Sequence, residues 1–87
     1  MTYQVIFSKG ASRQFKKLSP ELQERIQVKI DELVIEPRPH GVKKLEDDDL
    51  YRIRVGDYRV IYQIQDDILL INIVKVRHRS KAYRDDR

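Results

Sequence analysis

The spacing of apolar residues along the chain predicts one strand, then two helices, then three strands. Tyr3–Phe7 is a short β-branched and aromatic run, which is typical of a strand. From residue 8 the apolar positions follow helical spacing up to Leu33. Ser19-Pro20-Glu21 interrupts this pattern with an N-cap, a proline suited to the first helical position and an acidic residue that favours a first turn. We therefore expect two helices, at about 8–18 and 20–35.

The second half of the chain reads as a loop followed by strands. Two prolines and a glycine within Glu36–Gly41 end the second helix and predict a loop. Residues 50–55 and 58–65 flank a Gly-Asp turn, and residues 68–76 follow an Asp-Asp turn. This order predicts a single domain over residues 1–87 with a compact α+β fold, β-α-α-β-β-β, in which a helical hairpin packs on an antiparallel sheet.

The predicted core joins the apolar stripes of the helices to one face of the sheet. On the helices its members are Phe15, Leu18, Leu22, Ile26, Ile30 and Leu33, and on the strands Ile53, Val60, Tyr62, Ile71 and Ile73. Because residues 68–74 are apolar on both sides of the strand, the sequence leaves the orientation of Ile71 and Ile73 open.

Composition narrows the possible functions. The chain has no cysteine, which excludes a disulfide scaffold, a thiol nucleophile and a Cys-ligated metal. Its N-terminus does not read as a secretory signal and no apolar run is long enough to span a membrane, so we expect a cytoplasmic protein without a membrane partner. The net charge is +4, and residues 51–87 hold nine Lys or Arg against five Asp. This uneven distribution favours a polyanionic partner, first of all a nucleic acid.

Two basic groups stand out. Arg52 and Arg54 share one side of a predicted strand, with Arg59 across the hairpin. They fit either an ordinary solvated face or a phosphate site, since guanidinium groups bind phosphate oxygens bidentately. The second group, residues 75–83, combines basic residues with His78 and Tyr83, and it fits either a frayed basic tail or a single-stranded nucleic-acid surface.

The acidic run Glu46–Asp49 lacks the spacing of a calcium loop, and consecutive carboxylates in an extended loop diverge. A solvated acidic loop is the interpretation we adopt, and we expect no metal site. The serines have no obvious His and acid partners, so covalent catalysis has no support in the sequence.

The segments Lys43–Leu45, Leu50–Ile64 and Val76–Arg84 resemble the RelE/ParE superfamily of toxins from type II toxin–antitoxin systems. The run Tyr-Arg-Ile-Arg-Val-Gly-Asp-Tyr-Arg-Val-Ile-Tyr is the specific part of the match. The helical hairpin and the proline loop extend the resemblance over essentially the whole chain. On the RelE branch, the resemblance implies an endoribonuclease that cuts mRNA in the A site of the 70S ribosome. That reaction needs neither metal nor cofactor, because the ribose 2′-OH attacks the adjacent phosphate. The ParE branch implies instead a non-catalytic inhibitor of DNA gyrase.

Carried over by position, the resemblance also implies residue roles. Arg59 matches an arginine at the scissile phosphate, and Tyr83 matches a tyrosine that stacks on a base. Either Arg77 or Arg79 matches a late-strand arginine, and we assign the catalytic role to Arg79. The remaining assignments are a weaker acid–base role for His78, which follows Arg77 where other members have Gly-His-Arg, and RNA or phosphate binding by Arg52, Arg54, Lys75, Arg77 and Lys81.

RelE has paired lysines at the positions of Arg52 and Arg54. Because arginine is effectively never deprotonated, neither residue would act as a general base, although both would stabilise a charged transition state. The resemblance and the basic charge together imply a cognate antitoxin, acidic and partly disordered, from the same operon.

Overall fold

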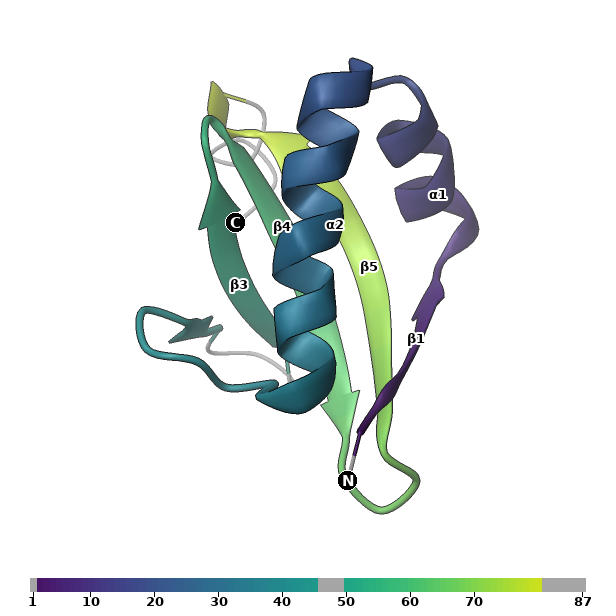
Figure 1. The fold of residues 1–87 in the computed structure, drawn as a ribbon, viewed down its shortest axis with the longest axis vertical. Helices are drawn as coiled ribbons and strands as arrows, with labels where there is room; N and C mark the ends of the chain where they lie inside the picture. The colour runs from purple at the N-terminus through teal and green to yellow at the C-terminus, as the bar shows by residue number, and fades with distance from the viewer. Residues whose placement is uncertain (1, 46–49, 81–87) are drawn as a thin grey trace.

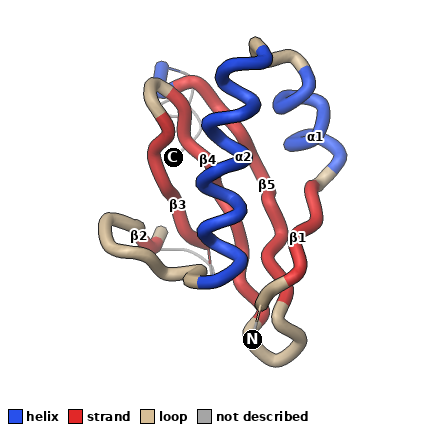
Figure 2. The backbone as a smooth tube through the Cα atoms, in the orientation of Figure 1, coloured by secondary structure: helices blue, strands red, loops and turns tan. Residues whose placement is uncertain are grey.

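The computed structural model describes residues 2–45 and 50–80, which form two helices on one face of a five-stranded sheet (Figure 1). The elements are β1 (Gln4–Phe7), α1 (Lys9–Lys16), α2 (Pro20–Ile35), β2 (Lys43–Lys44), β3 (Leu50–Val55), β4 (Tyr58–Gln65) and β5 (Leu70–His78). The strand order is β1-β5-β4-β3-β2. Figure 2 shows α2 crossing the middle of the sheet, with α1 beside β5. The predicted α+β fold is confirmed. Neither described helix has the length and apolar character needed to cross a bilayer.

A serine side chain caps the N-terminus of each helix. Ser19 Oγ accepts a hydrogen bond from the Leu22 amide at 3.3 Å, and Ser8 Oγ accepts one from the Ala11 amide at 3.1 Å. Helix α2 has the predicted bounds. Helix α1 ends at Lys16, before the predicted end, because the next two amides bond to carbonyls three residues back and tighten the last turn.

The sheet differs from the prediction in two respects. Strand β2 was not predicted, since Lys43–Lys44 carries no apolar alternation and forms only by pairing with β3. Strand β1 runs parallel to β5, so the sheet is mixed rather than wholly antiparallel. Strands β3 and β4 have the predicted bounds, whereas β5 starts and ends two residues later than predicted.

The core lies between α2 and the sheet. Ile26, Ile30 and Leu33 are at most 1% exposed and pack with the predicted sheet residues, Ile71 and Ile73 included. Phe15 and Leu18 lie at the margin of this core, and Leu22 is only half-buried. The Tyr62 hydroxyl, buried in the same core, donates to the Pro37 carbonyl at 2.7 Å, and burial raises the pKa of Tyr62.

A polar cluster ties together the end of the sheet near the N-terminus. The Arg38 guanidinium donates to both carboxylate oxygens of Asp66, at 2.8 and 3.2 Å, and the Tyr3 hydroxyl donates to Asp66 at 2.6 Å. Arg38 Nε also donates to the Tyr51 hydroxyl at 3.1 Å. The cluster joins the loop after α2, the β4–β5 turn and the start of the chain. Hydrogen bonds from Arg38 and then Tyr3 hold the pKa of Asp66 below its ordinary value.

We expect the folded chain to lose stability in acid, because protonation of Asp66 weakens this cluster. Because the pKa of Asp66 is lower in the folded chain than in the unfolded one, its contribution is present above the ordinary value of 3.8 and is lost as the pH falls through the folded pKa. Asp66→Asn should remove this part of the pH dependence of the unfolding free energy, measured by urea denaturation from neutral pH down to about pH 3. The matched control is Asp67→Asn at the adjacent exposed carboxylate. If the unfolding free energies of Asp66→Asn and the wild type depend on pH in the same way, Asp66 is not the source of the acid sensitivity.

Candidate functional site

The sheet face opposite the helices carries most of the basic residues of the strands. Side chains alternate along a strand, and the helix side takes the buried positions such as Ile53 and Val60. The residues that alternate with these buried positions along each strand point to the opposite face of the sheet. We call this surface the basic face, and its basic residues are Lys43, Arg52, Arg54, Arg59, Lys75 and Arg77.

Three of these arginines lie side by side. Arg59 on β4 pairs directly with Arg54 on β3 and with Arg77 on β5. Neighbouring strands are about 4.8 Å apart, so the three Cβ atoms form a short row across the strands. We call these residues the arginine row. Arg59, at its centre, is only 2% exposed.

The arginine row concentrates positive charge at one point. Like charges directly opposite one another on a sheet are unfavourable, and burial of a cation adds to the cost. The planar guanidinium fork matches the oxygens of a phosphate, which makes a phosphodiester the natural ligand for this geometry.

A β-bulge in β5 is responsible for the position of Arg77. In the pairing with β4, Ile61 lies opposite Lys75 and Tyr62 opposite Ile73, so Val74 is an extra residue. The bulge reverses the alternation of the strand. Without it, Arg77 would have the orientation of Ile73 and point toward the helices. The Ser8 hydroxyl, at the start of α1, donates to the Val74 carbonyl at 2.9 Å and holds the bulge in place.

A second row extends the basic face across β2. Lys43 pairs with Arg52, which pairs with Ile61, which in turn pairs with Lys75. Ile61 is only 4% exposed although it lies outside the helix-side core. This row brings Lys43 onto the basic face. Hydrophobic patterning did not predict this strand, because two lysines have no apolar alternation, and Lys43 was not among the predicted site residues.

The structure separates Arg79 and His78 from the arginine row. Strand β5 ends at His78, so Arg79 does not continue its alternation; Arg79 is exposed and its amide donates to the Asp57 carbonyl at 2.8 Å. The His78 ring packs edge-on against Tyr58, with centroids 5.3 Å apart, and its Nδ1 lies 3.0 Å from Ser80 Oγ. The arginine brought next to Arg59 is therefore Arg77. Tyr83 and Lys81 lie outside the described residues.

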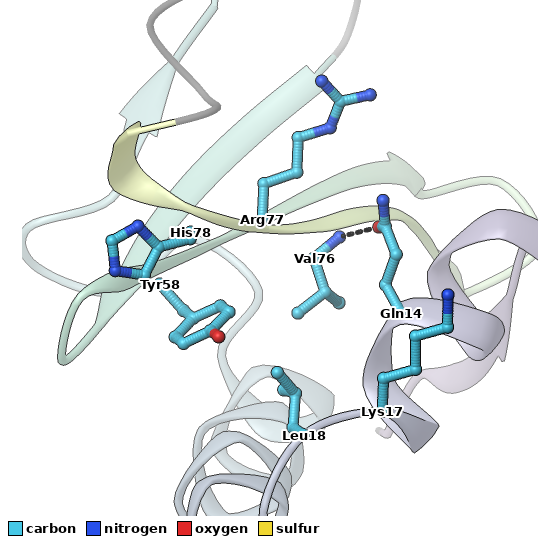
Figure 3. A pocket seen from close by; sticks show the side chains of 7 residues that line it. All are labelled: Gln14, Lys17, Leu18, Tyr58, Val76, Arg77 and His78. Carbon is cyan, nitrogen blue, oxygen red and sulfur yellow. Dashed lines mark hydrogen bonds between the residues drawn. The ribbon is translucent and has the colours of Figure 1, made fainter.

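A pocket of about 380 Å³ lies beside Arg77 (Figure 3). Its lining comes from the end of α1 and the residues that follow it, from β4 and from the end of β5, and includes Lys17, Tyr58 and His78. The Gln14 side chain accepts a hydrogen bond from the Val76 amide at 3.0 Å and fixes α1 against β5. In Figure 3 Arg77 extends to the opposite side of β5 from Val76 and Tyr58, which is the side of the basic face.

Among residues 2–45 and 50–80, the His, Asp and Glu side chains form no group of three or more that could hold a metal ion. The acidic run Glu46–Asp49 lies outside the described residues.

Comparison with known proteins gives consistent results. Residues 5–83 match the family model of the ParE toxin of the type II toxin–antitoxin system parDE. The mRNA interferase toxin RelE of Escherichia coli K12 is 28% identical over 98% of this chain and 94% of its own length. The putative toxin RelE1 of Methanocaldococcus jannaschii is 30% identical over 98% of this chain and 99% of its own. The crystal structure of the archaeal RelE–RelB complex from Pyrococcus horikoshii matches with a TM-score of 0.79 and 34% identity, covering 94% of this chain and all of that chain. The chain therefore belongs to the RelE/ParE superfamily of type II toxin–antitoxin toxins.

Proposed function

We propose that this toxin is an mRNA endoribonuclease that cuts messages in the A site of the 70S ribosome. The observation that carries the proposal is the arginine row, which places Arg59 between Arg54 and Arg77 on the helix-free face. A relative that matches over nearly its whole length is named an mRNA interferase. A row of guanidinium groups suits RNA cleavage because the reaction builds negative charge on a phosphate.

In the proposed reaction the ribose 2′-oxygen attacks the adjacent phosphorus. The new O2′–P bond forms as the P–O5′ bond breaks, which leaves a 2′,3′-cyclic phosphate and a free 5′-hydroxyl. Arg59 and Arg77 bind the non-bridging oxygens, and Arg52 and Arg54 bind flanking phosphate. These contacts strengthen as charge develops in the transition state, so they lower the barrier.

Two protons must move in this reaction. Because arginine stays protonated in proteins, it can neither accept the first proton nor give up the second. The 2′-hydroxyl loses one to a base, and the 5′-oxygen gains one. His78 is the residue of the described chain that we propose for proton transfer, with Tyr83 stacking on a base and Arg79, Lys75 and Lys81 binding RNA. Because His78 packs on Tyr58 rather than beside Arg59, a group from the ribosome or the RNA is the alternative base.

The proposed partners follow from the same family. Relatives have been solved as RelE–RelB toxin–antitoxin complexes. We propose that this chain binds a cognate antitoxin, acidic and partly disordered, from its own operon, and that it acts on ribosomes in the cytoplasm without a membrane partner.

The primary test is primer extension on mRNA from a translating extract supplied with the toxin. Wild-type protein should give cuts at ribosome-occupied codons. Arg59→Ala and Arg77→Ala should each lower the single-turnover rate by about 10²–10³-fold, the usual cost of losing one preorganised charge donor. Arg79→Ala is the matched control and should lower it far less, because Arg79 lies beyond the strand. Intact mRNA together with trapped gyrase–DNA cleavage complexes would replace this function with the ParE activity.

A second prediction concerns the extent of the RNA-binding surface. Lys43 pairs with Arg52 on the basic face, whereas Lys44 pairs with Tyr51 on the helix side. Binding of a 2′-O-methyl RNA oligonucleotide, which cannot be cleaved, is measured by fluorescence anisotropy over a range of salt concentrations. Lys43→Ala should reduce the salt slope by about one unit. Lys44→Ala should leave the slope unchanged. Equal slopes for the two variants would show that bound RNA does not reach Lys43.

A third prediction concerns the bulge. Ser8→Ala removes both the helix cap and the hydrogen bond to Val74, and should lower the unfolding free energy by about 1–2 kcal/mol. At a temperature where the variant is fully folded, its single-turnover cleavage rate should still fall, because Arg77 loses its fixed position. Ser8→Thr keeps a hydroxyl and should restore the rate, and Ser12→Ala in the same helix should have no effect. Normal cleavage by folded Ser8→Ala would show that the bulge does not need this bond.

A further inference from the structure

A row of uncharged residues crosses the sheet on the same face as the arginine row. Gln63 on β4 pairs with Asn72 on β5, and this pair is flanked by Leu50 on β3 and Ile6 on β1. All four alternate with residues of the core, so their side chains point away from the helices. We call these four residues the amide row. Its centre offers two carboxamide groups, and its two ends are apolar.

Asn72 is an unusual residue for its position. It lies between Ile71 and Ile73 in an interior strand of the sheet, where asparagine is disfavoured. Its Oδ1 atom is buried and has no hydrogen-bond partner among the described residues. A buried acceptor without a donor lowers the stability of the fold, and such departures from local preference are typical of functional sites. The fold therefore carries at Asn72 a polar atom that it does not itself use.

Basic residues connect the arginine row to the amide row. Gln63 follows Arg59 along β4 at a distance of about 13 Å, given a rise of about 3.3 Å per residue. Between the two rows, Ile61 is flanked by the cations Arg52 and Lys75. An RNA strand whose phosphates are held by the arginine row and by these two cations would reach the amide row next. Because the amide row has no charge, it suits a base rather than a phosphate.

A nucleobase matches the groups of the amide row. Proteins bind unstacked bases against apolar or aromatic side chains and form hydrogen bonds to the edge of the base. Ile6 is 49% exposed and supplies an apolar surface beside Asn72. Among the bases, adenine pairs with the amide of an asparagine or glutamine through its N6 donor and N7 acceptor. Its amino group is the kind of donor that the Asn72 oxygen lacks.

We propose that the amide row binds an adenine base of the RNA substrate, in a nucleotide a few positions from the cleaved bond. The adenine amino group donates to Asn72 Oδ1, Asn72 Nδ2 donates to N7, and Gln63 places a second amide beside the same edge. Because Asn72 as a whole is only half-buried, rotation of its terminal amide brings the oxygen to the surface. The inference rests on RNA as the ligand of the proposed function and adds a sequence preference to it.

Binding of 2′-O-methyl oligo(A), oligo(C) and oligo(U) of equal length tests the base preference by fluorescence anisotropy. The wild type should bind oligo(A) about tenfold more tightly than either of the others, as expected for a bidentate amide contact. Asn72→Leu should bind all three with similar affinity and keep the salt slope of the wild type, because it loses no phosphate contact. Leucine has the same branched shape and removes the unpaired oxygen, so urea denaturation should show no loss of stability.

Gln63→Leu and Gln65→Leu are matched variants on the same strand and the same face. Gln65 pairs with Leu70 and so lies outside the amide row. Gln63→Leu should reduce the preference for oligo(A), whereas Gln65→Leu should leave it as in the wild type. An equal loss for these two variants, or a preference that survives in Asn72→Leu, would overturn the proposal.

Primer extension on translating extract tests the same preference on the ribosome. Cuts by the wild type should be enriched in adenine at one fixed position near the cleaved bond, and cuts by Asn72→Leu should lose that enrichment. If the wild type cuts messages without this enrichment, the inference fails and the proposed function stands. If the wild type neither cuts messages nor binds any of the three oligonucleotides, the proposed function and this inference fail together.

Discussion

A single extra residue in β5, Val74, decides which side chains of this strand reach the basic face. Before the bulge, Ile71 and Ile73 point to the helices; after it, Val76 does so and Arg77 points away. The strand therefore contributes to the core along its whole length and still places an arginine beside Arg59. A regular strand could not do both with this sequence, because its alternation would turn Arg77 toward the helices.

Strand β4 supplies side chains to both faces of the sheet by regular alternation, without a bulge. Its even-numbered positions, Val60, Tyr62 and Ile64, fill the core, while its odd-numbered ones supply Arg59 and Ile61 to the opposite face. Arg59 is only 2% exposed and has an arginine opposite it on each neighbouring strand, so the sheet fixes the position of all three side chains. The surrounding sheet has to hold that arrangement before any RNA arrives. Such preorganisation is what makes a charge effective in a transition state, because no rearrangement is needed when negative charge develops.

The parts of the fold that local chemistry determines could be predicted from the sequence. The Ser19-Pro20 start of α2 and the tight turn between β3 and β4 each depend on a few adjacent residues, and both have the predicted bounds. Pairings between distant residues could not be predicted. Strand β2 exists only because Lys43 meets Arg52, and β1 lies parallel to β5 because Gln4 meets Leu70 across most of the chain. The choice between Arg77 and Arg79 belonged to this second group, since it depended on the bulge and on where β5 ends.

The two ends of the arginine row are held in place by different kinds of interaction. At one end, the tight turn between β3 and β4 sets Arg54 opposite Arg59, so a few adjacent residues determine that pairing. At the other end, Arg77 lies opposite Arg59 only because of the bulge at Val74, whose carbonyl accepts a hydrogen bond from the distant Ser8 hydroxyl. A slip of one residue in either pairing would turn an arginine to the helix side of the sheet. The geometry of the row therefore depends on local turn chemistry at Arg54 and on long-range packing at Arg77.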